Sequence, residues 1–166
     1  LTAILICLVS STYYLVADDL KVALAAEPTS MDPHYQNLTI NNSFATQIYN
    51  ALVLQDVNQN LIPGLATSWK PVDDRTWEFT LRKNVKFHNG ASFSAEDVIA
   101  SMERAANVPN SPSSFATFTK GKKFEMVDDF TIRVSTEKPY PFTPNDMSRI
   151  SIIDSAFLKA TTEDFN

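Results

Sequence analysis

The sequence is poor in glycine, cysteine and histidine. Of its 166 residues, 3 are glycine, 1 is cysteine and 2 are histidine. Neither a GxGxxG nor a GxxxxGK pattern occurs. Both phosphate-binding loops need glycine where the backbone approaches the phosphate, so nucleotide-dependent enzymes are poor candidates. A single cysteine excludes an intrachain disulfide framework and a cysteine-based zinc cluster.

The chain also lacks an excess of basic residues. It carries 19 acidic and 14 basic residues, which gives a net charge of −5. A nucleic-acid-binding protein needs a basic face, so this balance argues against nucleic acid as a partner. Hydrophobic residues make up 44% and charged residues 20%, as in ordinary globular proteins. Such a chain forms one domain, or one with a small subdomain, and needs no disulfide or metal to stabilise its core.

Charge is absent from residues 1–16, and residues 3–9 form an apolar block. This block has the length of the apolar region of a signal peptide, whereas a membrane-spanning helix needs about 20 apolar residues. Ala17 and the acidic pair after it resemble a cleavage site, so we expect an incomplete precursor of a secreted protein. The alternative is a buried first strand. The residue before Cys7 is Ile6 rather than a small residue, which argues against a lipoprotein anchor.

The beginning of the exported part predicts a strand and a helix. Residues 21–25 alternate apolar with polar or small residues, and Pro28 ends this strand pattern because it cannot donate to a ladder. Residues 41–43 offer side chains that cap a helix, and apolar residues then recur every four positions from Phe44 to Leu52. This spacing predicts an amphipathic helix with one buried face.

The clearest sheet signal is an alternation of aromatic and polar residues. Trp77, Phe79 and Leu81 alternate with polar residues, and a period of two places them on one face of a strand. We assign these aromatic side chains, together with Trp69 and Phe87, to the core.

The middle of the chain predicts a helix, a loop and a second hairpin. Ser94 stands three residues before Asp97, an arrangement that forms a capping box at a helix start. Residues 107–123 are polar and rich in proline and serine, which predicts a long loop. Alternating apolar residues at 124–134 predict the second hairpin.

The end of the chain predicts less regular structure. Prolines within residues 139–144 predict an extended segment, and a weak helical pattern follows at 154–160. The mixture of separate helices and hairpins indicates an α+β (mixed α/β) fold.

No arrangement of reactive residues indicates an enzyme. His34 and His88 are the only histidines, and they lack the i,i+4 spacing of a helical metal pair. No GxSxG motif occurs, and the acidic pairs at 73–74 and 128–129 lie in turn sequences, where aspartate is locally favoured. The sequence therefore predicts no catalytic residue, metal or cofactor. A secreted hydrolase that uses His88 is the distant alternative.

Four segments resemble a known family when they are taken in order. They are EPTSMDPH at 27–34, GLATSW at 64–69, WEFTLRKNVKFHNG at 77–90, and FSAEDV with SMER within 93–104. Together they closely resemble the signature region of the family 5 extracellular solute-binding proteins, the peptide- and nickel-binding receptors of bacterial ABC importers. The resemblance covers the chain from Lys21 onward.

The resemblance implies a two-lobed periplasmic-binding-protein type II fold, which closes on its ligand by a hinge. This chain would be the N-terminal part of that fold. We expect a partial signal peptide at 1–17, the start of lobe I at 18–51, a small α+β subdomain inserted at 52–135 and a return to lobe I at 136–166. Family members are longer, so the sequence would end before lobe II.

The resemblance also implies a function. The protein would bind di- or oligopeptides in the periplasm and deliver them to the membrane permease subunits of an ABC importer. It would carry out no reaction and need no cofactor. Two alternatives use the same fold, namely a receptor for signalling and a receptor for a non-peptide solute such as nickel, an opine or a sugar.

The resemblance places the ligand against two segments. In peptide-binding relatives the backbone after the first strand runs along the cleft, and an aromatic side chain follows a Ser-Pro pair in the long loop. The matching residues are Glu27, Pro28, Thr29, Ser30, Phe115 and Phe118. Pro28 interrupts strand pairing, which leaves neighbouring backbone groups free for an extended peptide. Alternatively, Phe115 anchors the loop on the subdomain.

Deletion of residues 1–17 is expected to keep the protein in the cytoplasm of a bacterial host, because the apolar export signal is lost. Cell fractionation and immunoblotting measure this, with the undeleted precursor as the control. Normal export of the shortened protein would contradict the signal-peptide prediction.

Overall fold

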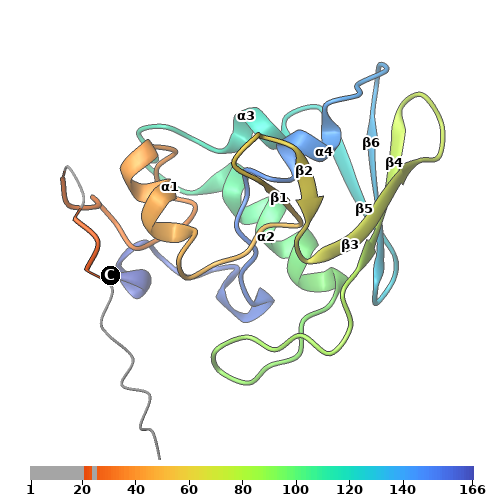
Figure 1. The fold of residues 1–166 in the computed structure, drawn as a ribbon. Coiled ribbons are helices and arrows are strands. Elements are labelled where there is room, and N and C mark those ends of the chain that lie inside the picture. Colours follow the sequence, from red (N-terminus) through yellow and green to blue (C-terminus); the bar gives the residue numbers. More distant parts are fainter. Residues whose placement is uncertain (1–20, 24–25) are drawn as a thin grey trace, which may run out of the picture.

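The computed structural model describes residues 21–23 and 26–166, and Figure 1 shows the helices on one side of a four-stranded sheet. In chain order the elements are α1 (Thr39–Ala45), β1 (Val53–Gln55), β2 (Leu61–Pro63), β3 (Ala66–Pro71), β4 (Thr76–Leu81), α2 (Ala95–Asn107), α3 (Ala116–Thr119), β5 (Lys122–Asp128), β6 (Thr131–Thr136), α4 (Thr143–Asp146), and the 3₁₀ turns η1 (Ser155–Phe157) and η2 (Glu163–Phe165). This mixture confirms the predicted α+β class. The signal peptide predicted at 1–17 lies outside the described residues.

The four-stranded sheet joins a first hairpin, β3 and β4, which holds the predicted strand through Phe79, to the predicted second hairpin, β5 and β6. Its strand order is β3-β4-β6-β5, and every neighbouring pair is antiparallel. The hairpins meet through β4 and β6, where Phe79 lies opposite Ile132 and Trp77 lies opposite Val134. Phe79, Ile132 and Val134 are fully buried whereas Thr80 is exposed, so the apolar side of the alternation faces the core.

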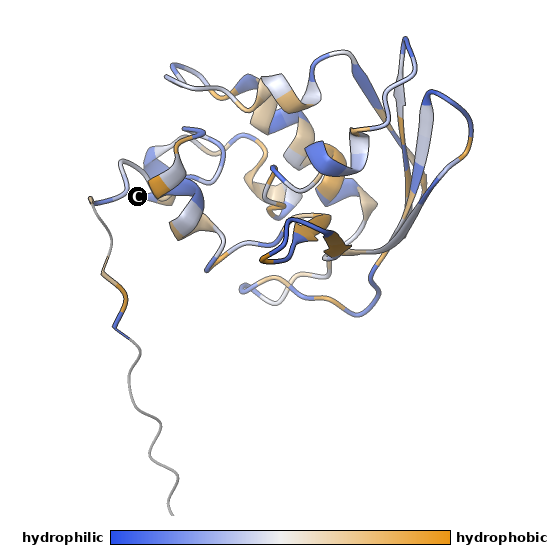
Figure 2. Cartoon of the chain, turned by 45° about the horizontal axis from the view of Figure 1, so that its top comes forward, coloured by the Kyte–Doolittle hydropathy of each residue, from blue (hydrophilic) through white to orange (hydrophobic). Residues whose placement is uncertain are grey.

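The aromatic side chains assigned to the core lie at two depths. Phe79 is fully buried, whereas Trp69, Trp77 and Phe87 are partly buried and pack against the margin of the core. Figure 2 shows the same distribution along the chain, with apolar residues toward the middle of the molecule and hydrophilic residues at the hairpin turns.

Helix α2 begins where the capping motif predicts. Ser94 and Asp97 form a capping box, in which the Ser94 N–H donates to Asp97 Oδ2 at 2.8 Å. One face of the helix packs into the core through Val98, Met102 and Ala105. α2 has 13 residues. Within the described part of the chain no helix has the length and apolar character that crossing a bilayer requires.

Helix α1 begins earlier and ends sooner than predicted. Asn41 lies inside the helix, where it is buried instead of capping the start. The predicted continuation to Leu52 is wrong, because the chain at 50–51 has left the helix and pairs with residues 151–152. This pairing joins segments that are far apart in the sequence, so helical spacing alone could not reveal it.

Two further segments differ from the prediction. The strand expected at 21–25 is not formed at 21–23, which are exposed, and residues 24–25 lie outside the described part. The loop predicted at 107–123 contains the short helix α3 and the start of β5. The Ser114 hydroxyl accepts from the Ala116 N–H at 3.0 Å, and this local contact helps start α3.

The C-terminal region is also more turned than expected. The segment predicted to be extended at 139–144 includes the first turn of α4, which tolerates Pro144 because no donor is needed there. The helix predicted at 154–160 is reduced to η1. Its N-cap is Asp154, whose side chain accepts from the Ala156 N–H at 2.9 Å.

Phe79→Ala is expected to lower the free energy of unfolding by about 3–5 kcal/mol, because it empties fully buried space. Trp77→Ala should cost less, because that ring is partly buried. Thr80→Ala on the exposed face is the control and should change stability by less than about 1 kcal/mol. Urea denaturation measures all three, and equal losses for Phe79→Ala and Thr80→Ala would contradict this placement of the core.

Candidate functional site

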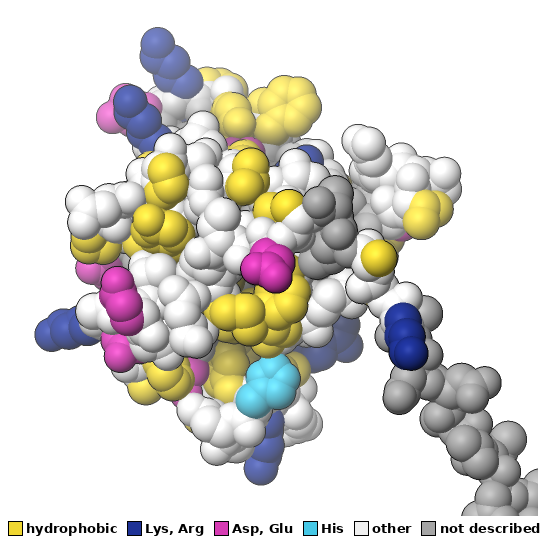
Figure 3. Space-filling view, turned by 90° about the vertical axis from the view of Figure 1, so that its left-hand side faces the viewer, with side chains coloured by type: hydrophobic (Ala, Val, Ile, Leu, Met, Phe, Trp, Pro, Cys, Tyr) yellow, Lys and Arg dark blue, Asp and Glu magenta, His cyan; other side chains and the backbone are white. Residues whose placement is uncertain are grey.

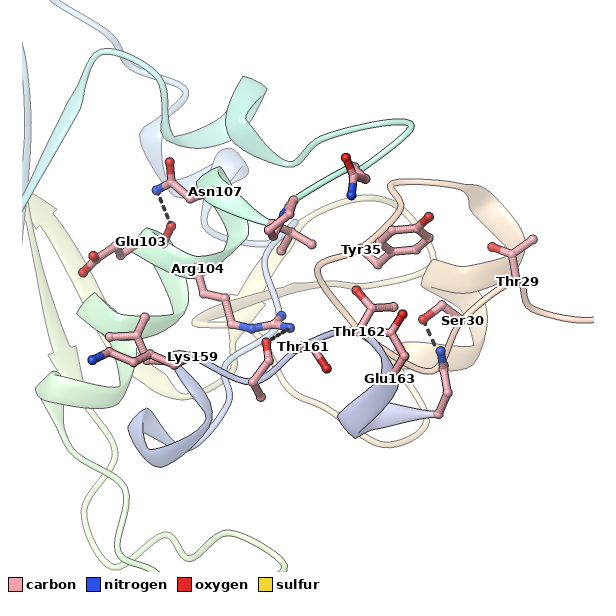
Figure 4. Close-up of a pocket in the computed structure, with 16 residues that line it drawn as sticks. Thr29, Ser30, Tyr35, Glu103, Arg104, Asn107, Lys159, Thr161, Thr162 and Glu163 are labelled. Atoms are coloured by element: carbon pink, nitrogen blue, oxygen red, sulfur yellow. Dashed lines mark hydrogen bonds between the residues drawn. The ribbon is translucent and has the colours of Figure 1, made fainter.

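A cavity of about 740 Å³ lies where three separate segments meet (Figure 4). One wall comes from the segment that contains Thr29, Ser30 and Tyr35. A second wall comes from the end of α2 and residues 108–110. The third comes from residues 158–163 together with the end of the described chain. Most of the lining side chains carry a hydroxyl, amide or charged group, and Val108, Pro109, Leu158 and Ala160 add apolar surface. We refer to this hollow as the polar cavity.

The loop after α2 is fixed against the first wall by hydrogen bonds. The Asn37 N–H donates to the Ser113 carbonyl at 2.8 Å, and the Ser111 hydroxyl donates to the Tyr35 carbonyl at 2.6 Å. Gln36 and Ser113 also form a parallel bridge. The two segments that the sequence analysis selected for ligand contact are therefore adjacent in the fold.

A buried ion pair forms part of the cavity wall, with Arg104 in the lining and Asp32 behind it. Arg104, near the end of α2, donates from Nη1 to Asp32 Oδ1 at 2.8 Å and from Nη2 to Asp32 Oδ2 at 2.7 Å. The two side chains are 4% and 0% exposed. Paired hydrogen bonds of this kind fix the relative orientation of a guanidinium and a carboxylate as well as their distance.

The same guanidinium reaches the third wall. Arg104 Nη2 donates to the Ala160 carbonyl at 3.1 Å, and the guanidinium carbon lies 4.6 Å from the centre of the Phe165 ring. The Thr162 hydroxyl donates to Asp32 Oδ2 at 3.2 Å. Arg104 and Asp32 thus connect all three walls.

His34 completes this buried cluster as a neutral side chain. Its Nδ1 lies 3.2 Å from Arg104 Nη1, and its Nε2 lies 2.8 Å from the Ser151 carbonyl. Because a guanidinium only donates, Nδ1 must accept and Nε2 must donate. Burial lowers the pKa of His34 to about 4, and the positive charge of Arg104 adds to this effect.

Asp32 keeps its negative charge in spite of burial. Burial alone would raise its pKa, but the hydrogen bonds from Arg104 and from the His34 N–H hold the pKa of this carboxyl below its usual value. The charges of Asp32 and Arg104 therefore balance each other. Glu103, Lys159 and Glu163 supply the other charged groups around the cavity.

Only two of the six residues predicted to touch ligand line the cavity. Thr29 and Ser30 line the cavity, whereas Glu27 and Pro28 are not part of its lining. Phe115 is 2% exposed and packs in the core, where it forms a T-shaped pair with His34 at a centroid distance of 6.3 Å. This placement favours the anchoring role that was the alternative for Phe115.

Phe118 is partly buried and packs against Phe115, at a ring-centroid distance of 6.3 Å. Neither aromatic side chain lines the polar cavity. Ligand contact by any of the six selected residues stays a prediction.

Arg104, Asp32 and Tyr35 are the important residues that motif reasoning missed. His34 was weighed as a metal ligand, and Asp32, His34 and Arg104 otherwise entered only as parts of the resembling segments. One signal was available, because Arg104 lies two residues after Met102 and directly before Ala105, within the buried stripe of α2. A charged residue at such a position needs a buried partner.

A second, apolar hollow of about 380 Å³ lies near the C-terminal turns. Phe87, Phe93, Phe157 and Phe165 line it, together with His88. Figure 3 shows hydrophobic side chains gathered on this side of the molecule beside a histidine. Among the described residues, no group of three or more His, Cys, Asp or Glu side chains is arranged to hold a metal ion.

Solved structures place this fold among the periplasmic binding proteins of the OppA type. The murein tripeptide binding protein MppA of Escherichia coli matches with a TM-score of 0.73 and 27% identity, over 82% of this chain and 31% of that one. Haemophilus influenzae OppA, in complex with the peptide RPPGFSPFR, matches with a TM-score of 0.72 and 26% identity, over 81% of this chain and 30% of that one.

Sequence comparison defines the family. The profile of the bacterial extracellular solute-binding proteins, family 5 (Middle), matches residues 60–166. The glutathione-binding protein GsiB of Salmonella choleraesuis is 32% identical over 127 residues, which are 76% of this chain and 25% of that protein. The chain belongs to the family 5 bacterial extracellular solute-binding proteins, as its motifs predicted, and it spans about a quarter of the length of the curated relatives that it matches.

The buried cluster predicts a loss of stability in acid. The unfolded chain binds a proton on His34 near pH 6.5, whereas the folded chain resists this proton until about pH 4. The contribution of His34 is therefore complete above pH 6.5 and is lost as the pH falls through about 4. The loss should approach about 3 kcal/mol. The lowered pKa of Asp32 acts in the same direction at still lower pH.

Urea denaturation between pH 7 and pH 4 measures this loss. His34→Gln is the matched variant, because its amide can donate to the Ser151 carbonyl and does not titrate. It should lose less stability than the unmodified protein over the same range. Identical pH dependence of the two proteins would contradict a buried neutral His34.

Proposed function

We propose that the protein is the extracytoplasmic binding component of an ABC importer for short peptides. The observation that carries this proposal is the match, over three quarters of the chain, to a relative named for glutathione, itself a short peptide. The protein would bind its ligand in the periplasm and present it to the permease subunits in the membrane. It would act by binding and release, without catalysis.

The chemistry of the polar cavity supports a peptide as the ligand. A peptide backbone presents a carbonyl and, except at proline, an N–H group at every residue, and both need partners once water is removed. Ser30, Asn107, Asn110 and Thr161 carry hydroxyl and amide groups in the lining. Such side chains can donate and accept, so they suit a backbone whatever its side chains are.

We further propose that this chain supplies only part of the binding surface. Residues 52–135 would form the small subdomain of lobe I, and residues 18–51 and 136–166 would belong to the body of that lobe. A two-lobed receptor gains affinity from contacts on both sides of its ligand, whereas the loss of translational freedom, about 4 kcal/mol or more, is met only once. One lobe alone should therefore bind weakly.

The complete gene product is expected to bind peptides with a Kd in the micromolar range or below. Residues 18–166 alone should show no binding at micromolar concentration, because halving a binding energy of about −8 kcal/mol shifts the Kd from micromolar to millimolar. Isothermal titration calorimetry with a synthetic pool of di- to pentapeptides measures both proteins.

The outcomes separate the parts of this proposal. Tight binding by residues 18–166 would show that the site lies wholly within them and would contradict the division between two lobes. Failure of the complete gene product to bind any peptide would contradict a peptide ligand. Binding of a nickel chelate, an opine or a sugar by that same protein would then favour the non-peptide alternative.

A further inference from the structure

Arg104 is a side chain whose hydrogen bonds reach all three walls of the polar cavity. It belongs to α2, whose end forms one wall, and its guanidinium holds Asp32 behind the first wall and the Ala160 carbonyl in the third. Its Nε–H has no acceptor among the described residues, so its hydrogen bonds are all made by the two terminal nitrogens.

We propose that Arg104 is the positioning residue of the ligand site, which it holds in shape through Asp32 and the Ala160 carbonyl. The proposal deepens the proposed binding function and rests on it. Arg104 lines the cavity but is only 5% exposed. Because its charge is already paired with Asp32, it acts on the ligand through the walls that it joins and not through its own charge.

The first wall is fixed by a short chain of contacts. Arg104 holds the Asp32 carboxylate, and the Asp32 N–H donates to the Ser30 hydroxyl at 3.0 Å. That hydroxyl in turn donates to Asn166 Oδ1 at 3.0 Å. Ser30 lines the cavity, whereas Asp32 does not. A displacement of Asp32 would therefore move Ser30 in the site.

The third wall depends on the same two side chains. The Ala160 carbonyl accepts from Arg104, and the Thr162 hydroxyl donates to Asp32. The Phe165 ring covers the guanidinium. Residues 158–163 have little regular structure of their own, since the described elements here are two 3₁₀ turns. Their position follows from these side-chain contacts more than from backbone pairing.

A lysine at position 104 would keep the charge but lose the geometry. Its single ammonium group cannot make the two parallel bonds to Asp32 and also reach the Ala160 carbonyl, because a guanidinium fork is needed for that set. One buried acceptor would then lack a partner, and the walls would separate to let water in.

His34 allows this positioning to be tested from outside the cavity. His34 is fully buried and does not line the cavity, but its Nδ1 accepts from Arg104. The charged groups that face it are Asp32 from its own segment and Arg104 from α2, and the Ser151 carbonyl and the Phe115 ring enclose it. A proton on Nδ1 would oppose the Arg104 N–H and push the guanidinium from its place.

The test compares Arg104→Lys with Arg149→Lys in the complete gene product. Arg149 is exposed, so the second variant makes the same chemical change without touching the cluster. The ligand is the tightest-binding peptide of the di- to pentapeptide pool. Arg104→Lys is expected to weaken its Kd by about tenfold or more in protein that circular dichroism shows to be folded, whereas Arg149→Lys should not change it. A folded Arg104→Lys variant with unchanged Kd would overturn the proposal.

The pH dependence of the Kd, measured in folded protein, separates a positioning role from a general loss of stability. In folded protein the Kd of the unmodified chain should rise toward pH 4 by more than that of His34→Gln, although His34 does not touch the cavity. Parallel pH profiles of the unmodified protein and His34→Gln would count against the proposal. This comparison also decides the positioning role if Arg104→Lys does not fold.

Amide hydrogen exchange of the ligand-free protein tests the positioning role of Arg104 without relying on peptide binding. Arg104→Lys should speed exchange both at residues 30–32 and at residues 160–162, and Arg149→Lys should not. If no peptide binds the unmodified protein, the proposed function fails while exchange still decides the positioning role. Unchanged exchange at both segments would overturn it.

Discussion

The paired hydrogen bonds between Arg104 and Asp32 join residues that lie 72 positions apart in the chain. Around them the segment before α1, the end of α2 and the last turns of the described chain come together. A buried ion pair contributes little net stability, because two charges lose their water, but removal of one partner typically costs about 3–5 kcal/mol. The contact therefore selects one arrangement of the three segments and penalises the others.

Helix α2 connects the ion pair to the rest of the fold. Its apolar face packs into the core beneath the sheet, while Ser101 and Arg104 face the C-terminal segment. The Ser101 hydroxyl donates to the Asp97 carbonyl at 2.7 Å and accepts from the Ile153 N–H at 2.9 Å. Helix α2 thus contacts both the core and the segment that closes the cavity. Because the core holds α2 in place, it also holds this wall of the site.

The elements that sequence predicted well are those set by local patterns. The Ser94–Asp97 capping box and the alternation through Phe79 and Leu81 depend on neighbours within a few residues, and the helix and hairpins formed as expected. The end of α1 was missed because pairing of 50–51 with a distant segment decides it. The buried cluster was missed for the same physical reason.

The resemblance to a family predicted site residues that sequence patterns alone did not indicate. It selected Thr29 and Ser30, which line the cavity, but it could not indicate that Phe115 points into the core. Burial of a loop aromatic depends on what lies beneath the loop, here His34. Sequence offered only the Ser-Pro pair before it.

A crystal structure of the complete gene product with a bound peptide would show whether the cavity that Arg104 lines, with Asp32 paired behind it, is part of the ligand site. We expect peptide density against Thr29 or Ser30 and against residues 108–110, with Arg104 still paired to Asp32. Peptide bound elsewhere, with this cavity filled by another part of the chain, would contradict it.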